Sequence, residues 1–172
     1  MRAYRSAVFA LIAFTLEALP AAAQDAKAVE VTPYVGLGSE MASPVGAAIT
    51  FPVTSKLSVE TDVAYRRGEG DIHALSLSAG LLYSLPRVRQ STPYLAAGIG
   101  LSQYGAPILS PNGPPIGTQP RLAVTMNAGG GLKMPMTERM DLRTDARWFK
   151  SPGQGSDQFR VAQGLSFKVG KR

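Results

Sequence analysis

The chain has 172 residues, which is the length of a single domain, and its formal net charge is +6. It contains no cysteine and one histidine, which excludes a disulfide framework and leaves too few ligands for a cysteine- or histidine-based metal site. Only 17% of the residues are charged, and the bases are interleaved with acids, which argues against nucleic-acid binding.

The N-terminus has the three parts of a secretory signal. Two arginines precede an apolar stretch from Ala7 to Leu19, and three alanines at 21–23 provide the small residues of a cleavage site. The apolar stretch is too short for a comfortable membrane anchor, which needs about 20 residues. We therefore expect residues 1–23 to be a cleaved signal peptide and residues 24–172 to form one exported domain, an outer-membrane β-barrel. The later sequence contains no apolar run long enough for a transmembrane helix.

Eight segments of the exported part alternate apolar and polar residues with a period of two, the pattern of two-faced β-strands. They are Val29–Gly38, Val45–Val53, Leu57–Arg66, Ala74–Leu85, Tyr94–Tyr104, Leu122–Met134, Met140–Phe149 and Phe159–Val169. Most are longer than the five or six residues of a typical globular strand and approach the about 9–11 residues of a tilted membrane strand.

The connections between these segments differ in character. Compact turns follow the second, fourth and sixth segments, at Pro52–Lys56, Pro86–Thr92 and Pro135–Arg139. Polar or glycine-rich loops follow the first, third, fifth and seventh segments, at Ser39–Pro44, Arg67–His73, Gly105–Arg121 and Ser151–Gln158. Short turns at one end and longer loops at the other are typical of outer-membrane barrels, with the turns on the periplasmic side. The third loop has 17 residues and holds five prolines.

An internal repeat relates two of the predicted hairpins. Phe51–Tyr65 aligns without gaps on Met134–Trp148, with Pro, two Thr and Asp recurring in place and an aromatic residue at the C-terminal end of each copy. Arg143 stands where the first copy has Glu60. Recurring turn-plus-strand units suit a meander of hairpins that closes into a barrel.

The two faces of the predicted strand Met140–Phe149 differ in residue composition. One face is apolar and ends in the only tryptophan of the chain, Trp148, whereas the other alternates acid and base. Membrane barrels turn apolar side chains to lipid and keep a polar interior. We therefore assign the charged faces of the strands to the interior. The residues are Glu30, Glu60, Asp62, Arg66, Lys133, Asp141, Arg143, Asp145, Arg147, Arg160 and Lys168.

These five acids and six bases are nearly balanced, and an eight-stranded barrel is only wide enough for side chains to fill it. We expect the charges to pair with one another as a structural plug, because unpaired buried charges are costly. A narrow path for ions or protons along the same residues is the functional alternative.

Other positions are expected at the strand ends. Tyr65, Tyr83, Tyr94, Tyr104 and Trp148 fall where an interfacial girdle would lie, although for Tyr94 and Tyr104 we favour burial in the interior. Four bases of the compact turns face the predicted periplasmic side, where they would meet phosphate-bearing lipid or acidic wall polymers. They are Lys56, Arg87, Arg89 and Arg139.

Three segments carry a resemblance to a known family: Thr92–Ser102, Asn127–Lys133 with the strand after it, and Gly164–Val169. They resemble the small outer-membrane β-barrel superfamily of outer-membrane protein A-like and opacity-protein-like domains, over residues 29–170. The resemblance implies an all-β, eight-stranded antiparallel up-and-down transmembrane barrel in a Gram-negative outer membrane, in contact with its lipid.

In this family the last strand carries a signal for the barrel-assembly machinery, and Gly164, Phe167 and Val169 fit it. Ala162 stands where the family has a polar residue, and Gly170-Lys-Arg172 follows where it often ends at an aromatic residue.

The sequence thus predicts a non-enzymatic, monomeric outer-membrane barrel with a structural or surface-interaction role, without a cofactor or metal, and it does not indicate the surface partner. His73 is followed by Ala74 and Leu75, not by the neighbouring serine that membrane lipid deacylases of this size use. Alternation alone leaves two alternatives open. One is a narrow, porin-like pore, and the other is a water-soluble, lipocalin-like carrier of an apolar ligand, with the two faces exchanged.

Overall fold

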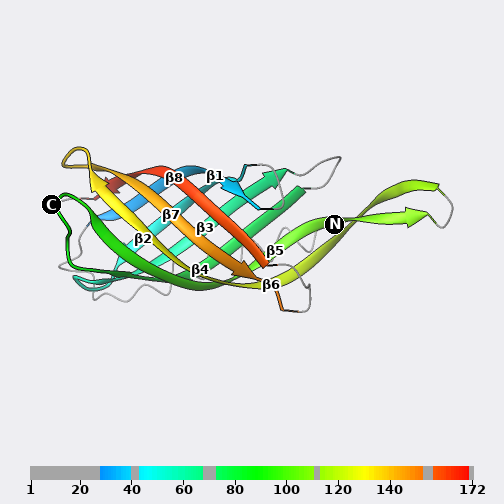
Figure 1. Cartoon of the computed structure of the whole chain (residues 1–172), viewed down its shortest axis with the longest axis horizontal. Coiled ribbons are helices and arrows are strands. Elements are labelled where there is room, and N and C mark those ends of the chain that lie inside the picture. Colours follow the sequence, from blue (N-terminus) through cyan, green and yellow to red (C-terminus); the bar gives the residue numbers. More distant parts are fainter. Residues whose placement is uncertain (1–27, 40–42, 68–72, 111–112, 153–156, 171–172) are drawn as a thin grey trace.

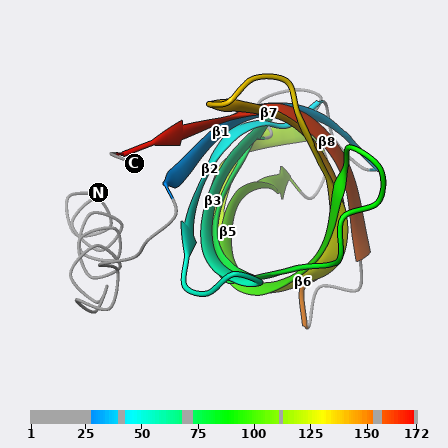
Figure 2. The same ribbon diagram turned by 90° about the vertical axis from the view of Figure 1, so that its left-hand side faces the viewer.

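The computed structural model describes residues 28–39, 43–67, 73–110, 113–152 and 157–170, so the predicted signal peptide lies outside the described residues. Eight antiparallel strands form a closed barrel, in which each strand pairs with its neighbours in the chain and β8 pairs with β1 (Figures 1 and 2). The strands are β1 (Val29–Gly38), β2 (Val45–Pro52), β3 (Leu57–Arg67), β4 (His73–Ser84), β5 (Thr92–Ser110), β6 (Gly113–Pro135), β7 (Met140–Lys150) and β8 (Asp157–Val169). The predicted eight-stranded, up-and-down barrel is confirmed.

The described residues include no helix that is long and apolar enough to cross a membrane.

The prediction of a loop over the whole of Gly105–Arg121 is wrong for the described residues. The strands β5 and β6 continue through most of this segment as a paired hairpin that projects beyond the rest of the barrel (Figure 1). Past Tyr104, β5 has no partner on β4, and the part of β6 before Met126 has none on β7. Each strand of such a ribbon has one edge without a neighbour, where a proline removes no ladder hydrogen bond. A two-stranded ribbon therefore tolerates proline better than a central strand does, although prolines indicate a loop in the sequence.

The barrel is apolar on the outside and polar on the inside. Large hydrophobic side chains point outward along every strand, and Ile99 near the middle of β5 is 64% exposed. Charged and hydroxyl side chains point inward, and Glu60 is only 2% exposed. A water-soluble carrier of an apolar ligand would need the reverse arrangement, so the structure contradicts the lipocalin-like alternative. The outward face is the kind of surface that a bilayer covers.

Aromatic side chains lie at both ends of the outer surface. Trp148 and Phe159 are cross-strand partners near the end that carries the longer loops, with their ring centroids 6.4 Å apart, and Tyr65 points outward near the same end. Tyr83 points outward near the compact turns. Tyr94 is buried inside the barrel, as predicted, and Tyr104 is half-buried opposite the buried Ala74. Except for Tyr94 and Tyr104, these positions match the two girdles of a membrane barrel.

The two copies of the internal repeat form hairpins with closely similar turns. The Thr54 amide donates to the carbonyl of Leu57 at 2.9 Å, and the Thr137 amide donates to the carbonyl of Met140 at 3.0 Å. Each threonine hydroxyl also accepts an amide hydrogen bond within its own turn, from Leu57 at 2.9 Å and from Arg139 at 3.3 Å. The repeated sequence therefore encodes a repeated hairpin, and it places Glu60 of β3 and Arg143 of β7 at equivalent positions.

Candidate functional site

The centre of the barrel is built around the carboxylate of Glu60. Arg143 donates from both of its terminal nitrogens, one of them at 3.2 Å, and Arg147 donates from Nη2 at 2.5 Å. The hydroxyl of Thr50 on β2 adds a hydrogen bond of 3.0 Å. These groups come from strands on opposite sides of the barrel, so the pairs cross the interior. The equivalent residues of the two repeats, Glu60 and Arg143, thus contact one another.

Asp145 connects the three arginines of the interior. Arg143 Nη2 and Arg147 Nε lie 3.2 and 2.9 Å from its carboxylate oxygens, and Arg160 Nη2 lies at 3.5 Å. The Tyr94 hydroxyl donates to Oδ2 at 2.8 Å and accepts from Arg143 Nε at 2.8 Å. Tyr94 is therefore part of the charged network, and its burial follows from these bonds.

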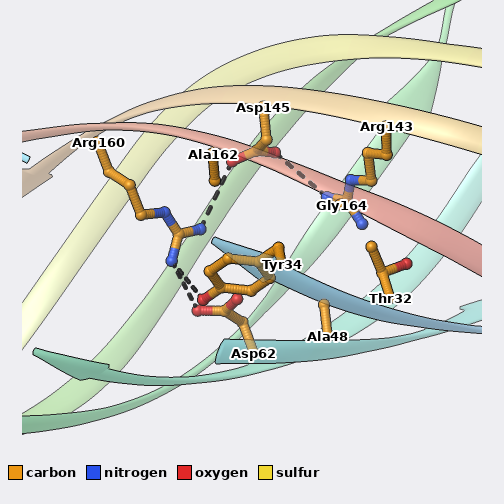
Figure 3. Close-up of a pocket in the computed structure, with 9 residues that line it drawn as sticks. All are labelled: Thr32, Tyr34, Ala48, Asp62, Arg143, Asp145, Arg160, Ala162 and Gly164. Carbon is orange, nitrogen blue, oxygen red and sulfur yellow. Dashed lines mark hydrogen bonds and ion pairs between the residues drawn. The ribbon is translucent and has the colours of Figure 1, made fainter. Parts of the chain in front are cut away.

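Arg160 of β8 completes the network on the side of β1 (Figure 3). Its Nη1 donates to the Tyr34 hydroxyl at 2.7 Å and to Asp62 Oδ1 at 3.1 Å. The guanidinium also lies over two aromatic rings, 4.8 Å from the centroid of Tyr34 and 5.1 Å from that of Phe149. Such cation–π contacts add to the stability of a desolvated cation.

The central network therefore contains three carboxylates and three guanidinium groups and is neutral in formal charge. Its members are Glu60, Asp62, Asp145, Arg143, Arg147 and Arg160. All six are buried. Taking ions out of water costs several kcal/mol each, and this cost is offset only where the partners are close and well hydrogen-bonded. Glu60, Asp145 and Arg143 meet this condition, whereas Asp62 Oδ2 and Arg160 Nε are buried without a hydrogen-bond partner.

Four of the other predicted interior residues form two ion pairs near the compact turns. Lys133 pairs with Glu30, and Lys168 lies 2.9 Å from Asp141. These pairs are less buried than the centre, since Lys168 keeps 32% of its side-chain surface exposed. Arg66 lies toward the opposite end, where it donates to Gln158 and lies 5.6 Å from the centroid of the Phe149 ring. The structure thus places all eleven predicted residues, but only six of them meet at the centre.

Sequence reasoning missed the contributions of Tyr34 and Tyr94 to this network. Their cross-strand neighbours are glycines: Gly164 lies beside Tyr34, and Gly131 lies beside Tyr94. A Cβ on Gly131 would come within 2.4 Å of the Tyr94 hydroxyl oxygen, so only glycine leaves room for this ring. The signal is a glycine directly opposite a tyrosine, which can be recognised only once the strand register is known.

One small cavity lies within the network. The cavity beside Tyr34, Asp62, Arg143 and Arg160 has a volume of about 10 Å³, which is room for a single water molecule (Figure 3). A larger cavity of about 300 Å³ lies at the end with the compact turns. The interior therefore consists of a packed, charged middle and a roomier mouth.

The residues of the predicted assembly signal lie on β8. Phe167 and Val169 point outward with large exposed surfaces. Gly164 lies between strands, where a Cβ would come within 2.4 Å of the Pro33 carbonyl oxygen. This glycine therefore has a packing role of its own.

Neither the network nor the rest of the described chain contains a group of three or more His, Cys, Asp or Glu residues that could hold a metal ion. His73 lies at the start of β4 opposite Arg67, away from the central charges.

Neither a protein-family model nor a curated protein sequence matches the chain. Solved structures with the same architecture do match. The N-terminal β-barrel domain of Pseudomonas aeruginosa OprF has a TM-score of 0.65 at 16% identity, covering 83% of this chain and 98% of that one. Neisserial surface protein A has a TM-score of 0.62 at 14% identity, covering 82% of this chain and 96% of that one. The attachment invasion locus protein Ail of Yersinia pestis has a TM-score of 0.53 at 12% identity, covering 84% of this chain and 98% of that one. The chain therefore has the fold of the small eight-stranded outer-membrane β-barrels.

Proposed function

We propose that the protein is a non-enzymatic, monomeric barrel of a bacterial outer membrane, closed by a charge-paired plug, with a structural or surface-interaction role. The observation that carries this proposal is the neutral network at the centre. Its three carboxylates and three arginines bridge the interior and leave a cavity of only about 10 Å³ among them. Hydrated ions have no room to pass through such a centre.

The membrane part of the proposal is supported by the outer surface. The outward side chains of all eight strands are mostly apolar, and aromatic residues lie at both ends. Burying this surface in water-free lipid is favourable, whereas leaving it in water would expose far more apolar area than soluble proteins tolerate. The outer-membrane neighbours in fold agree with this location.

Two other elements fit the proposed role. Phe167 and Val169 are exposed on the last strand, where the barrel-assembly machinery would read them. The β5–β6 hairpin projects past the barrel on the side opposite the compact turns, which we assign to the cell surface (Figure 1). This hairpin is the element best placed to contact a surface partner. We infer no catalytic role for the barrel.

Conductance in planar bilayers tests the plug directly. We predict that the reconstituted wild-type barrel shows no steady ionic current, because the central ion pairs fill its cross-section. The double variant Glu60→Ala/Arg143→Ala removes one charge of each sign and should admit water and pass a measurable current.

A current from the double variant shows that this variant has entered the bilayer, and a heat-dependent electrophoretic mobility of the wild type recovered from the same lipid shows that it has entered too. A steady current through the wild type, of similar size to that of the double variant, would contradict the plug and favour the porin-like alternative.

A further inference from the structure

The larger cavity, which we call the turn-end vestibule, is formed by strand ends and turns from around the whole barrel. It has a volume of about 300 Å³, and its charged lining residues are Glu30, Arg87, Lys133, Asp141 and Lys168. It lies at the end that faces the viewer in Figure 2. Small-molecule sites in proteins begin at about this size.

The charges of the vestibule do not cancel. Lys133 pairs with Glu30, and Lys168 pairs with Asp141, so these four residues are neutral together. Arg87 lies in the β4–β5 turn, and no acidic side chain of the described residues forms an ion pair with it. The lining therefore carries one positive charge in excess, and this charge is a guanidinium at the edge of the cavity.

The remaining polar lining consists largely of hydroxyl groups. Thr54, Ser55, Ser58, Ser84 and Thr92 border the vestibule, as does Thr50, whose hydroxyl already donates to Glu60. Hydroxyl groups donate to anionic oxygens and also exchange hydrogen bonds with the hydroxyls of a ligand. A planar guanidinium, two ammonium groups and several hydroxyls match the tetrahedral oxygens of a phosphate better than they match an apolar ligand.

The strand register brings these groups onto adjacent positions. Thr50, Glu30 and Lys168 follow one another across β2, β1 and β8, and Thr92 lies directly opposite Lys133 across β5 and β6. The side chains belong to paired strands of a closed sheet, so the positions of the lysines are held before any ligand arrives. A preorganised site spends less free energy on ordering its groups.

We propose that the turn-end vestibule binds a small phosphate-bearing, hydroxyl-rich ligand, with Arg87 as the main contact to the phosphate and Lys168 beside it. The phosphate can belong to a soluble periplasmic compound or to the headgroup of a lipid in the facing leaflet. This site is separate from the central plug, so its test is independent of the conductance experiment.

Nuclear magnetic resonance of the full-length protein in a nonionic detergent tests the proposal. The probes are inorganic phosphate and glycerol 3-phosphate, with glycerol as the uncharged control. We expect saturable shifts of the Arg87 side-chain signal and of the Thr92 and Lys168 amides with the phosphates and none with glycerol. Arg87→Ala should weaken phosphate binding at least about tenfold, because it removes charge-assisted hydrogen bonds.

Arg139→Ala is the matched variant. It removes an exposed arginine from another turn at the same end, and this residue does not line the vestibule. It should change the affinity less than about twofold, as expected for an exposed charge that is screened by solvent and does not line the cavity. Equal weakening by the two variants would overturn the proposal, because it would indicate a general attraction of anions to the basic turns.

Adding phosphatidylglycerol or uncharged diacylglycerol to the micelles separates the two sources of phosphate. Saturable shifts with the soluble phosphates support a soluble ligand, and shifts only with phosphatidylglycerol support a lipid headgroup. The absence of saturable shifts with every phosphate probe would overturn the proposal.

Discussion

Replacing Glu60 with alanine is expected to lower the free energy of unfolding by about 3–5 kcal/mol, the largest effect of any single substitution considered. The reason is that Arg143 and Arg147 both donate to this carboxylate inside the barrel, so its loss leaves two buried cations with one shared partner, Asp145. Urea unfolding in phospholipid vesicles measures the change, with the fluorescence of Trp148 as the signal. Trp148 is the only tryptophan and points outward, so its emission reports the transfer from lipid to water.

The matched control is Glu30→Ala. Removing Glu30 leaves its partner Lys133 unpaired, but this pair lies at the mouth of the barrel. There, 15–17% of each side-chain surface is exposed to solvent. The expected cost is about 1 kcal/mol or less, because water can solvate the lysine that remains. Adding Arg143→Ala to Glu60→Ala should recover part of the loss, since one of the unpaired cations is gone. Equal costs for Glu60→Ala and Glu30→Ala would show that the central network does not carry the stability assigned to it.

Replacing Ile99 with arginine is expected to cause the second largest loss in the free energy of unfolding. The substitution tests which face of the barrel contacts lipid. Ile99 points outward near the middle of the barrel part of β5, and 64% of its surface is exposed. An arginine at the bilayer midplane of a membrane barrel costs about 2–4 kcal/mol, whereas near the interface the cost falls to about 0–1 kcal/mol. We therefore expect a loss of about 2–4 kcal/mol in vesicles, measured by the same unfolding experiment.

Gln103→Arg provides the depth control. Gln103 lies on the same strand and the same face, four residues nearer the end with the longer loops, and is exposed. The substitution should cost no more than about 1 kcal/mol, because an arginine there reaches the interface. If both arginine variants are tolerated equally, the outward face is not covered by a bilayer at the depth of Ile99.

Most of the strands could be predicted from the sequence, because an alternation of apolar and polar residues with a period of two is typical of strands and not of helices. The predicted bounds of β1 agree with the observed ones, and β2, β3, β4 and β7 differ from prediction by one residue at the ends. The hairpin extension of β5 and β6 was missed because prolines normally interrupt strands. They are tolerated there only because the extension has no outer partner strands, and this is a property of the assembled barrel.

The residues that face the interior could be predicted from the alternation of side chains along each strand. Their interaction partners could not. A shift of two residues in the register of one strand keeps every side chain on its face and changes every partner. The pairing of Glu60 with Arg143 joins residues 83 positions apart, and nothing local in the sequence indicates it. The same limit explains why Tyr94, at the start of a strand, could not be recognised as a member of the charged network.

The arrangement of the repeat suggests why the network is centred where it is. The two copies form equivalent hairpins on opposite sides of the barrel, and they differ in sign at one inward position. Because Glu60 and Arg143 occupy equivalent heights, a single change of charge between the copies is enough to bring an acid and a base together. The repeated hairpins thus supply five of the six central residues, and Arg160 of β8 completes the neutral network.

The measurement that tests the central claim most directly is electrophoresis of the detergent-extracted membrane fraction with and without boiling. A lipid-facing, closed barrel resists unfolding by the detergent, so the unboiled protein should migrate at a shifted position and move to its full apparent mass only after heating. Recovery of the protein in the soluble periplasm without detergent, with the same mobility before and after boiling, would contradict the membrane barrel.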